Sequence, residues 1–500
     1  MTDLPRTDLT LSGQRLDIPD LEQVAAPVDI KVDPVLRDRV ADCQAFLLRC
    51  LAENRPVYGS TTGYGALVGF AANENPADQC ASAINHLAAG QGDELPAPVV
   101  RAAMLIRLTS LCQGRSGVSL SVVDALTAAL GTGFAPAVPR LGSLGASGDL
   151  VPLAYVARAL CGLGHAYLDG VRLPAETALH RAGLTPLRLD GRDALALVNG
   201  VSLTAAAGGL ATAVLERCQA GAVLLSALMV DILGCTPAFL APQLLAAFGH
   251  PGTVRVGDQL RQLLTGLVPG TGRALQEPYS IRCTPQLLGA ARTSLDHAGE
   301  VIRADLNGIS DNPLFFAEDD LVAHGGNFFG QPVAFVADLL SITAAQLGNL
   351  AERQLDLLID PHRNGGLPPM LTPAPGRQHG VQGVQLAATA MVAALRRAAT
   401  PASFQSLPTN GHNQDVIPFG TQAALNALDQ ANLLRLLNGS LAVVLRQAVH
   451  VGGRRPTAPA CLDLFEQLTE VVAPIDLDRP LDVEVRNAAA LLDRLTGGPS

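Results

Sequence analysis

The pattern of apolar positions divides the chain into a mixed first part and a strongly helical second part. Residues 34–53 repeat their apolar side chains at helical spacing, and residues 95–132 predict two helices joined near residues 113–117, where Gly and Ser gather. Residues 1–34 are rich in Pro and Asp, which favours an irregular or lightly structured segment. We therefore expect residues 1–200 to form a smaller, mostly helical domain.

Beyond residue 193 the apolar pattern becomes almost purely helical. Stretches rich in Ala and Leu keep a helical period over residues 202–234, 285–305, 331–359, 380–400 and 421–448. Turn signals such as Pro-Gly fall between these stretches, which predicts an up-and-down bundle over residues 201–500. Two strand-like pieces, residues 166–173 and 314–322, are too short for a major sheet. The predicted fold class is mainly α, with a long-helix bundle.

Composition narrows the classes of function that this fold could serve. Apolar residues make up 48% of the chain and charged residues 16%, which suits a large oligomer that buries much of its surface. The net charge is −10, and Arg supplies nearly all the positive charge because Lys31 is the only lysine. The scattered arginines form no stripe for nucleic acid. Pyridoxal enzymes and Walker-type loops need a lysine, and Lys31 lies in a segment that we interpret as a connector.

Cysteines, histidines and the N-terminus also constrain the class of protein. The nine cysteines are widely spaced, odd in number and without a Cys-x-x-Cys pair, which predicts free, mostly buried thiols in a reducing compartment. The ten histidines show no paired metal-ligand spacing, so we expect no metal. No signal peptide is evident, and the longest apolar run, residues 220–229, meets Asp231 too early to span a bilayer. We expect a soluble cytoplasmic protein with no membrane partner.

Residues 142–155, Gly-Ser-Leu-Gly-Ala-Ser-Gly-Asp-Leu-Val-Pro-Leu-Ala-Tyr, interrupt the helical pattern with small residues. The simplest interpretation is a tight turn that leads into a helix, with Asp149 as its N-cap. A second interpretation is chemical. If the turn is held strained, the Gly148 nitrogen can attack the Ala146 carbonyl, and loss of water closes a five-membered ring. Loss of a second water from Ser147 leaves a 4-methylidene-imidazol-5-one (MIO), an electron-poor alkene.

The run Gly-Ala-Ser-Gly-Asp-Leu-x-Pro-Leu at residues 145–153 resembles the prosthetic-group segment of the histidine, phenylalanine and tyrosine ammonia-lyase and aminomutase family. Further segments similar to this family follow in the same order across residues 55–440. The resemblance implies a carbon–nitrogen lyase with ammonia-lyase (fumarase/aspartase-like) architecture and an MIO built from Ala146, Ser147 and Gly148. It also implies that no metal or diffusible cofactor is used, and that a homotetramer draws each active site from three subunits.

Two further irregular segments match segments of this family. The glycine-rich run at residues 58–65 predicts on its own a flexible loop or lid. By resemblance it is the inner lid loop, and Tyr58 is the base that removes a β-proton. The run at residues 276–283 would on its own hold an arginine in a structural ion pair. By resemblance, Arg282 binds the substrate carboxylate through a bidentate fork, and Tyr279 lies close to the electrophile.

Three more positions are assigned by resemblance. Asn199 is similar to the asparagine that hydrogen-bonds the electrophile or the substrate amine, although Val201 stands where the family usually has Thr. Phe328 resembles the aromatic residue packed near the methylidene. Asn312 lies in a Ser-Asp-Asn-Pro turn similar to that of the family, where a helix-end cap is an equal alternative.

The choice of amino acid rests on two segments. His86 and Leu87 resemble the pair found in tyrosine-selective members, and a histidine can hydrogen-bond a phenol that an apolar pocket would reject. Histidine-specific relatives carry Glu where Gln414 falls, and plant phenylalanine-specific relatives carry Glu where Asn410 falls. Neither carboxylate is present here, which favours tyrosine. Gln382 departs from the pattern at another pocket position.

The expected reaction is elimination of ammonia from L-tyrosine to give trans-p-coumarate. A tyrosine 2,3-aminomutase that gives β-tyrosine would use the same residues, and phenylalanine or histidine ammonia-lyase activity is a further alternative. A catalytically inactive helical scaffold is disfavoured because Tyr58, Ser147 and Arg282 are all present. A fumarase/aspartase-type lyase would share the helical tetramer, but its Gly-Ser-Ser-x-Met-Pro-x-Lys segment is absent from the sequence.

Overall fold

The computed structural model describes residues 7–13, 15–452 and 454–498, which form two compact units. Unit 1 comprises Met1–Leu210, Gly299–Asp338 and Pro401–Leu425, and unit 2 comprises Ala211–Ala298, Leu339–Thr400 and Asn426–Ser500. The sequence predicts two continuous parts, residues 1–200 and 201–500. The units are instead discontinuous, because four long helices each contain residues of both units.

The N-terminal segment contains regular structure that its composition does not predict. Strand β1 (Thr7–Leu11) pairs in parallel with β2 (Val28–Val32), in continuous register. Residues of β2 alternate between buried and exposed, as in a strand with one covered face. This corrects the expectation of an irregular segment, of which residues 1–6 and 14 lie outside the described residues. Lys31 is thus a strand residue and not part of a connector.

Helices make up most of unit 1. They are α1 (Ile18–Gln23), α2 (Pro34–Ala52), α3 (Pro76–His86), α4 (Ala97–Cys112), α5 (Leu120–Leu130), α6 (Leu150–Leu160), α7 (Ala175–Arg181) and α8 (Asp193–Val198), with 3-10 turns η1 (Gly65–Leu67), η3 (Ala317–Asp319) and η5 (Asn410–His412). The other strands are β3 (Gln91–Glu94), β4 (Phe134–Pro136), β5 (Pro139–Leu141), β6 (His165–Leu168), β7 (Val171–Pro174), β8 (Leu314–Phe316) and β9 (Leu321–Ala323). The helices predicted before residue 135 are confirmed, and both strand-like pieces form hairpins, β6–β7 and β8–β9.

A buried arginine ties the centre of unit 1 together. Arg101 lies in α4, where every residue from Val99 to Cys112 is buried. Its guanidinium donates to five backbone carbonyls, those of Val24, Ala26, Leu130, Thr132 and Phe134. These carbonyls follow or end α1 and α5, where helices leave acceptors without intrahelical partners. Burial lowers the pKa of Arg101 to about 10.

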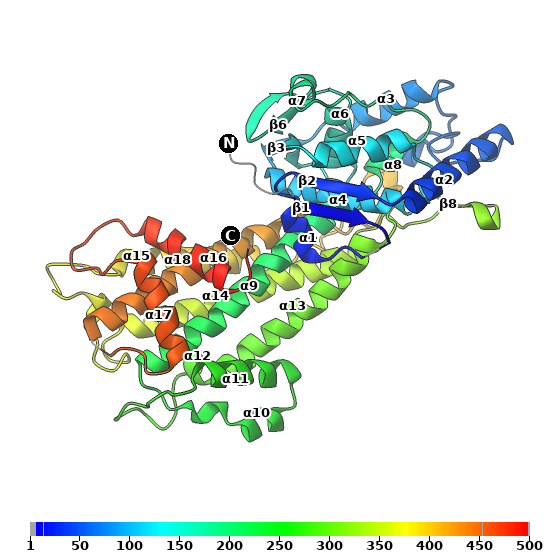
Figure 1. Cartoon of the computed structure of the whole chain (residues 1–500). Helices are drawn as coiled ribbons and strands as arrows, with labels where there is room; N and C mark the ends of the chain where they lie inside the picture. Colours follow the sequence, from blue (N-terminus) through cyan, green and yellow to red (C-terminus); the bar gives the residue numbers. More distant parts are fainter. Residues whose placement is uncertain (1–6, 14, 453, 499–500) are drawn as a thin grey trace. The chain divides into compact units, whose positions relative to one another are not determined.

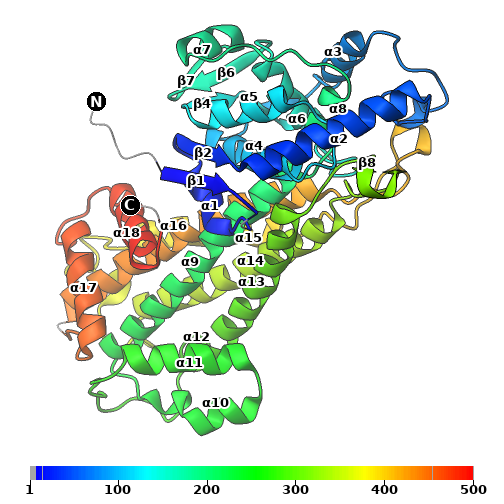
Figure 2. The same cartoon turned by 45° about the vertical axis from the view of Figure 1, so that its right-hand side comes forward.

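Unit 2 is built from helices, as Figure 1 shows. The long ones that enter it are α9 (Ser202–Ile232), α13 (Thr284–Asn307), α14 (Gln331–Ile359), α15 (Gln382–Ala398) and α16 (Gly420–Gly452). The shorter ones are η2 (Pro237–Leu240), α10 (Pro242–Phe248), α11 (Pro251–Leu263), α12 (Tyr279–Arg282), η4 (Pro369–Leu371), α17 (Pro459–Val471) and α18 (Asp482–Leu495). In Figures 1 and 2, α9, α13 and α14 run alongside one another. All five predicted long helices are confirmed.

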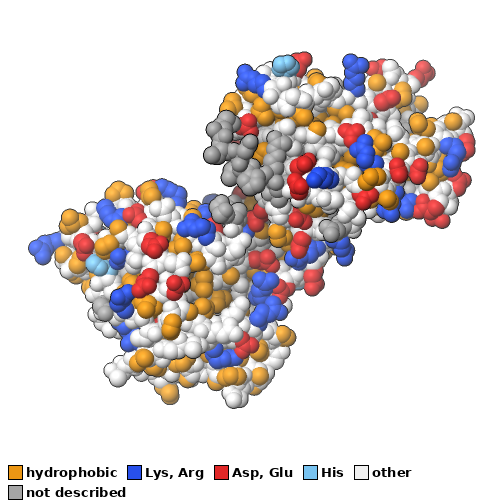
Figure 3. Space-filling view, in the orientation of Figure 1, with side chains coloured by type: hydrophobic (Ala, Val, Ile, Leu, Met, Phe, Trp, Pro, Cys, Tyr) orange, Lys and Arg blue, Asp and Glu red, His pale blue; other side chains and the backbone are white. Residues whose placement is uncertain are grey.

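Two stretches are long and apolar enough to cross a membrane by length and composition alone, Asp193–Ile232 and Gln331–Ile359. Their most apolar windows are 100% and 72% buried inside the structure. Burial of this extent makes them core helices of the folded chain. On the face drawn in Figure 3, acidic and basic side chains are interspersed among apolar ones.

Candidate active site

A pocket of about 690 Å³ lies in unit 1, and segments far apart in the sequence line it. They are the loop after α2, the end of α3, the turn before α6, the end of α8 and three later loops. Nine of the predicted site residues line this pocket: Tyr58, His86, Leu87, Ser147, Asn199, Asn312, Phe328, Asn410 and Gln414. Ala146 and Gly148 flank Ser147 and are buried.

The turn that presents Ser147 requires glycine at two positions. Gly145 and Gly148 have φ values of 66° and 75°, in the left-handed region that disfavours side chains. A Cβ atom at Gly148 would lie 2.4 Å from the backbone nitrogen of Gly200, which leaves no space for it. The Gly148 N–H donates to the carbonyl of Phe328 at 2.9 Å. The chain is therefore bent on both sides of Ser147 and held in that shape.

A fully buried carboxylate anchors this turn. The hydroxyls of Ser143, Thr204 and Thr421 lie 2.7, 2.8 and 2.8 Å from Asp149 Oδ1, and the Thr204 N–H donates to Oδ2 at 2.8 Å. Thr204 is in the first turn of α9, so Asp149 caps that helix. It stands at the N-cap position of α6 but makes no side-chain cap bond there, which corrects the simple interpretation. Burial raises the pKa of Asp149, and these donors oppose the shift.

Two side-chain amides hold Ser147. Asn199 Nδ2 donates to the Ser147 carbonyl at 2.8 Å, and Gln414 Nε2 donates to the Ser147 hydroxyl oxygen at 2.8 Å. The Thr409 hydroxyl donates to Gln414 Oε1 at 2.8 Å, which leaves the Gln414 amide nitrogen to face Ser147. The structure therefore brings two of the predicted residues into contact with the predicted reactive segment. Thr409 is a positioning contact that the sequence does not signal.

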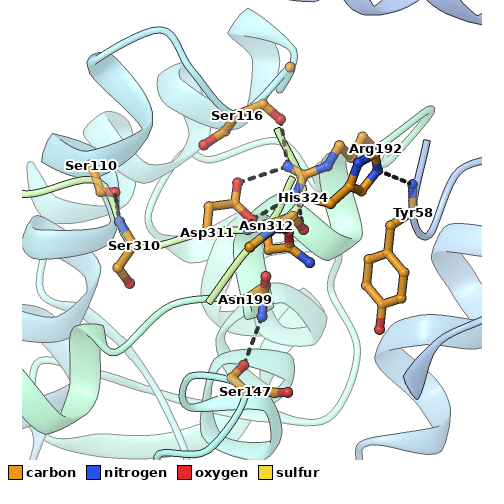
Figure 4. Close-up of polar contacts among 12 residues, drawn as sticks. Tyr58, Ser110, Ser116, Ser147, Arg192, Asn199, Ser310, Asp311, Asn312 and His324 are labelled. Carbon is orange, nitrogen blue, oxygen red and sulfur yellow. Dashed lines mark hydrogen bonds and ion pairs between the residues drawn. The ribbon is translucent and has the colours of Figure 1, made fainter. Parts of the chain in front are cut away.

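A buried ion pair lies next to the pocket (Figure 4). Arg192 donates to both carboxylate oxygens of Asp311 at 2.8 and 2.7 Å, and neither side chain is exposed. The same guanidinium donates to the carbonyls of Ser116 and Asn312 at 2.6 Å each, so it fixes the backbone at a predicted site residue. Burial lowers the pKa of the nearby Arg107 to about 10. Asp311 belongs to the Asp-Asn-Pro turn, but nothing in the sequence marks Arg192 as its partner.

The loop that carries Tyr58 folds back on itself. The Gly65 N–H donates to the phenolic oxygen of Tyr58 at 2.7 Å, which stabilises negative charge on that oxygen. The Tyr64 ring packs edge-on against the Tyr58 ring, with centroids 6.3 Å apart. Burial raises the pKa of Tyr64 to about 12, which keeps Tyr64 a phenol at neutral pH. The Tyr58 N–H donates to His324 Nε2 at 3.2 Å, and His324 is not predicted as a site residue.

His86 lies at the end of α3 with one ring nitrogen fixed. Its Nδ1 is 2.9 Å from the carbonyl of Ser82, which can only accept, so Nδ1 carries the proton and Nε2 keeps a lone pair. The ring stacks on Tyr64, with centroids 6.3 Å apart and planes at 19°. Leu87 adds an apolar side chain to the pocket wall. The predicted pair thus offers a hydrogen-bond acceptor beside an apolar surface.

Tyr279 and Arg282 belong to unit 2, whereas the pocket is lined by residues of unit 1. They form α12, where the guanidinium carbon of Arg282 lies 4.6 Å from the centroid of the Tyr279 ring. Tyr279 is 70% exposed. Arg282 Nε is buried and has no hydrogen-bond partner among the described residues.

The described residues offer this pocket neither a metal-ligand cluster nor a reactive thiol. No group of three or more His, Cys, Asp or Glu side chains that could hold a metal occurs within residues 7–13, 15–452 and 454–498. All nine cysteines are described and free, and seven of them are buried. Burial raises the pKa of Cys43 to about 11 and that of Cys218 to about 12, so these thiols stay protonated. The chemistry of the pocket rests on hydroxyl, phenol, imidazole and amide groups.

Known proteins are similar to this chain in both sequence and fold. The model of the aromatic amino acid lyase family matches residues 16–470. A histidine ammonia-lyase of Symbiobacterium thermophilum is 38% identical, over 96% of each chain. A tyrosine ammonia-lyase of Cupriavidus metallidurans is also 38% identical, over 92% of this chain and 91% of that protein. The crystal structure of a tyrosine aminomutase from Streptomyces globisporus matches with a TM-score of 0.91 and 31% identity, over 98% of this chain and 97% of that one.

Proposed function

The chain belongs to the aromatic amino acid lyase family and is a carbon–nitrogen lyase, and we propose that it eliminates ammonia from L-tyrosine to give trans-p-coumarate. The observation that carries the choice of substrate is the fixed tautomer of His86 in the pocket. The reacting groups are proposed to be Tyr58 and an electrophile formed from Ala146, Ser147 and Gly148. The arguments for each of these assignments follow separately.

The turn at residues 145–148 fits an MIO group made from its own backbone. Gly148 has no side chain to obstruct ring closure, and its positive φ bends the chain where the ring would close. Gln414 Nε2 donates to the hydroxyl oxygen of Ser147, the oxygen that must leave as water. When formed, the group would supply an electrophile that makes the substrate amine a better leaving group. Asn199 is placed to orient that group through the Ser147 carbonyl.

Tyr58 is the base in this proposal. The β C–H of tyrosine is barely acidic, so its removal needs a base held close to the substrate. The Gly65 N–H donates to the Tyr58 oxygen and stabilises the phenolate that accepts the proton. Tyr64 is also in the pocket, but burial raises its pKa to about 12, so at neutral pH it stays a protonated phenol and cannot accept a proton. Tyr64 instead packs between Tyr58 and His86.

His86 supports tyrosine over phenylalanine. The Ser82 carbonyl takes the proton on Nδ1, so Nε2 remains an acceptor for the phenolic O–H of a tyrosine side chain. His86 is exposed in the single chain, so phenylalanine would leave this nitrogen without a partner in the pocket that another subunit completes, at a cost of about 1–3 kcal/mol. Leu87 provides the apolar contact that the ring needs. A fixed acceptor beside an apolar side chain suits a phenol.

The side-chain amides of the pocket support tyrosine over histidine. Gln414 stands where histidine-specific relatives carry a Glu, and Asn410 stands where plant phenylalanine-specific relatives carry one. The Gln414 amide is already engaged, because Thr409 donates to its oxygen and its nitrogen donates to Ser147. A cationic substrate side chain would find no anion among these groups. Histidine remains the second candidate, because relatives named histidine ammonia-lyase are as similar as the tyrosine enzyme.

The carboxylate site and the assembly are part of the same proposal. Arg282 has a buried Nε without a partner among the described residues, and the exposed Tyr279 lies against it. An anionic ligand would supply what the guanidinium lacks. We assign Arg282 to the substrate carboxylate and Tyr279 to the amine. Both would act in a cytoplasmic homotetramer, in which another subunit completes each pocket. Asn312 and Phe328 would line the same completed site.

One experiment separates this function from its rivals. The purified enzyme is incubated with tyrosine, phenylalanine and histidine in turn, and the products are identified by chromatography and mass. We expect p-coumarate from tyrosine at the highest kcat/KM. β-Tyrosine as the main product would show that the enzyme is an aminomutase. The similar Streptomyces structure is named as a tyrosine aminomutase. Urocanate as the main product would show that histidine is the substrate.

A further inference from the structure

We propose that His324 is a positioning residue, which holds the loop carrying Tyr58 in place through the backbone nitrogen of Tyr58 and releases it when the imidazole is protonated. The assignment of Tyr58 as the base rests on the proposed function, whereas the attachment of the loop does not. His324 lies outside every segment from which the sequence assigns a role. It contacts no reacting group and acts only through Tyr58.

The hydrogen bond fixes the protonation state of His324. A backbone N–H is a donor only, so His324 Nε2, at 3.2 Å from the Tyr58 nitrogen, must offer a lone pair. Figure 4 shows the imidazole facing this nitrogen while the Tyr58 ring points away from it. A protonated imidazole would set one N–H against another and lose the bond. The attachment at Tyr58 therefore exists only when His324 is neutral.

His324 is itself fixed to the buried ion pair. The next residue, Gly325, donates its N–H to Asn312 Oδ1 at 2.8 Å, and the Asn312 carbonyl accepts from Arg192 at 2.6 Å. Arg192 is fully buried and paired with Asp311. Each bond joins backbone to a fixed partner, so the imidazole is attached to the rigid part of unit 1. This gives the loop a stationary anchor.

A second attachment joins the same two segments. Arg55 donates to the Asp320 carboxylate at 2.8 Å and to the Asp320 carbonyl at 2.7 Å. Asp320 lies in the β8–β9 hairpin, four residues after Phe316 ends β8, and Phe315 of that strand packs edge-on against Phe46 of α2. The hairpin is thus docked by an apolar contact and reaches the loop at Arg55 and at Tyr58. Of the two attachments, the one at Tyr58 contains the histidine.

Protonation of His324 gives this attachment a pH dependence. The charged group that acts on His324 is Arg192, which is paired with Asp311, and Arg55 with Asp320 forms the other ion pair at this attachment. None of these four is a histidine, so His324 is the member of the set that titrates near neutral pH. Loss of hydration and the positive charge of Arg192 lower the pKa of His324. Because the attached state has the lower pKa, the attachment is complete above about pH 6.5 and is lost as pH falls through that lowered value.

Two substitutions separate the hydrogen bond from the bulk of the side chain. His324→Gln keeps an acceptor that does not titrate, and His324→Leu keeps volume without an acceptor. Hydrogen exchange of the full-length protein without substrate is followed for the peptide covering residues 57–65, between about pH 5 and 8. We expect His324→Leu to exchange about three- to tenfold faster at pH 8, and His324→Gln to match the parent. In the parent alone, exchange corrected for intrinsic rates should rise toward acid pH.

Steady-state kinetics provide the second measurement. His324→Leu should lower kcat by a similar factor with little change in KM, and His324→Gln should retain kcat while losing the acidic limb that His324 causes. The other pocket histidine, His86, is present in all three proteins and does not account for a difference between them. Equal exchange in all three proteins, or a Gln variant as mobile as the Leu variant, overturns the inference. If exchange behaves as expected but no p-coumarate forms from tyrosine, the attachment stands and the proposed function fails.

Discussion

The two sides of the pocket are built in contrasting ways. On the side of Ser147, a buried carboxylate gathers three hydroxyls and a backbone N–H, and two amides hold the serine itself. On the side of Tyr58, the loop is attached by hydrogen bonds to His324 and Asn410 and by an exposed ion pair. One side resembles a protein core and the other resembles a surface loop.

This contrast fits the role that the proposed function gives to each side. Ring closure within a backbone needs a turn that stays bent, and buried, satisfied hydrogen bonds resist relaxation. A base that meets its substrate only after binding must sit on a segment that can admit that substrate, and such segments come from the least stable part of a fold. Changes on the Ser147 side should therefore affect formation of the electrophile, and changes on the Tyr58 side should affect turnover alone.

Removal of the Ser147 hydroxyl is expected to have the largest effect. Ser147→Ala cannot lose the second water, so it should lose nearly all activity while folding normally. Intact mass should then lack the loss of two waters expected for the parent, with unchanged circular dichroism. Ser121→Ala, an exposed serine of α5, is the matched control and should keep both mass loss and activity. Parent-like turnover by Ser147→Ala would remove the chemical basis of the proposed function.

Removal of the Tyr58 hydroxyl should lower turnover without affecting formation of the electrophile. Tyr58→Phe keeps the ring that packs against Tyr64 but removes the proton acceptor, so kcat should fall by about 10²–10⁴-fold. The mass loss of two waters should be retained, because the Ser147 side is intact. Tyr64→Phe is the matched control, with a smaller expected loss. An equal loss in both variants would show that Tyr58 is not the base.

Selectivity should respond to His86 more than to any group on the Ser147 side. His86→Phe removes the Nε2 acceptor, so the ratio of kcat/KM for tyrosine to that for phenylalanine should fall by about 10- to 100-fold. Competition between the two amino acids measures this ratio directly. The companion Leu87→Ile changes shape without polarity and should leave the ratio within severalfold. An unchanged ratio in His86→Phe would assign the phenol to another group.

On the Ser147 side, the buried carboxyl group of Asp305 makes the stability of the protein depend on pH. Burial and the negative charge of Asp149 raise the pKa of Asp305 to about 6, and Asp305 Oδ2 has no hydrogen-bond partner among the described residues. The native state therefore holds this proton to higher pH than the unfolded chain, so stability falls as pH rises between about 4 and 6 and stays lower above it. Asp305→Asn should stabilise the protein at pH 8 by about 1–2 kcal/mol and have little effect at pH 4. Thermal unfolding at both pH values tests this, and equal effects at both would contradict it.

The sequence predicts the long helices. It does not predict contacts between segments that lie far apart in the chain. The five long helices are visible because their apolar period is local and each needs only its own residues. The parallel pairing of β1 with β2 is not visible, because each strand is five residues long and its partner lies beyond an intervening helix. Short strands carry too little periodicity to distinguish them from irregular chain.

The candidate site shows the same division. Family-like runs identify Tyr58, Ser147 and Gln414, and all three line the pocket. The groups that hold them are separated by long stretches of chain: Thr421 lies 272 positions from Asp149, and His324 lies 266 positions from Tyr58. A lone Thr or His has no local pattern that names its partner. Such contacts depend on the tertiary structure and become visible only with it.

The smallest expected effects compare one anchor from each side. Thr421→Val keeps the shape of the side chain but leaves the fully buried Asp149 with one donor fewer, which should lower the free energy of unfolding by about 1–3 kcal/mol. Arg55→Ala removes an exposed ion pair, and solvent screening should keep the midpoint of unfolding within error of the parent. Exchange of residues 57–65 should rise only in Arg55→Ala. The opposite assignment, a stable Thr421→Val protein beside a destabilised Arg55→Ala protein, would mean that the loop and not the buried carboxylate is the rigid side of the pocket.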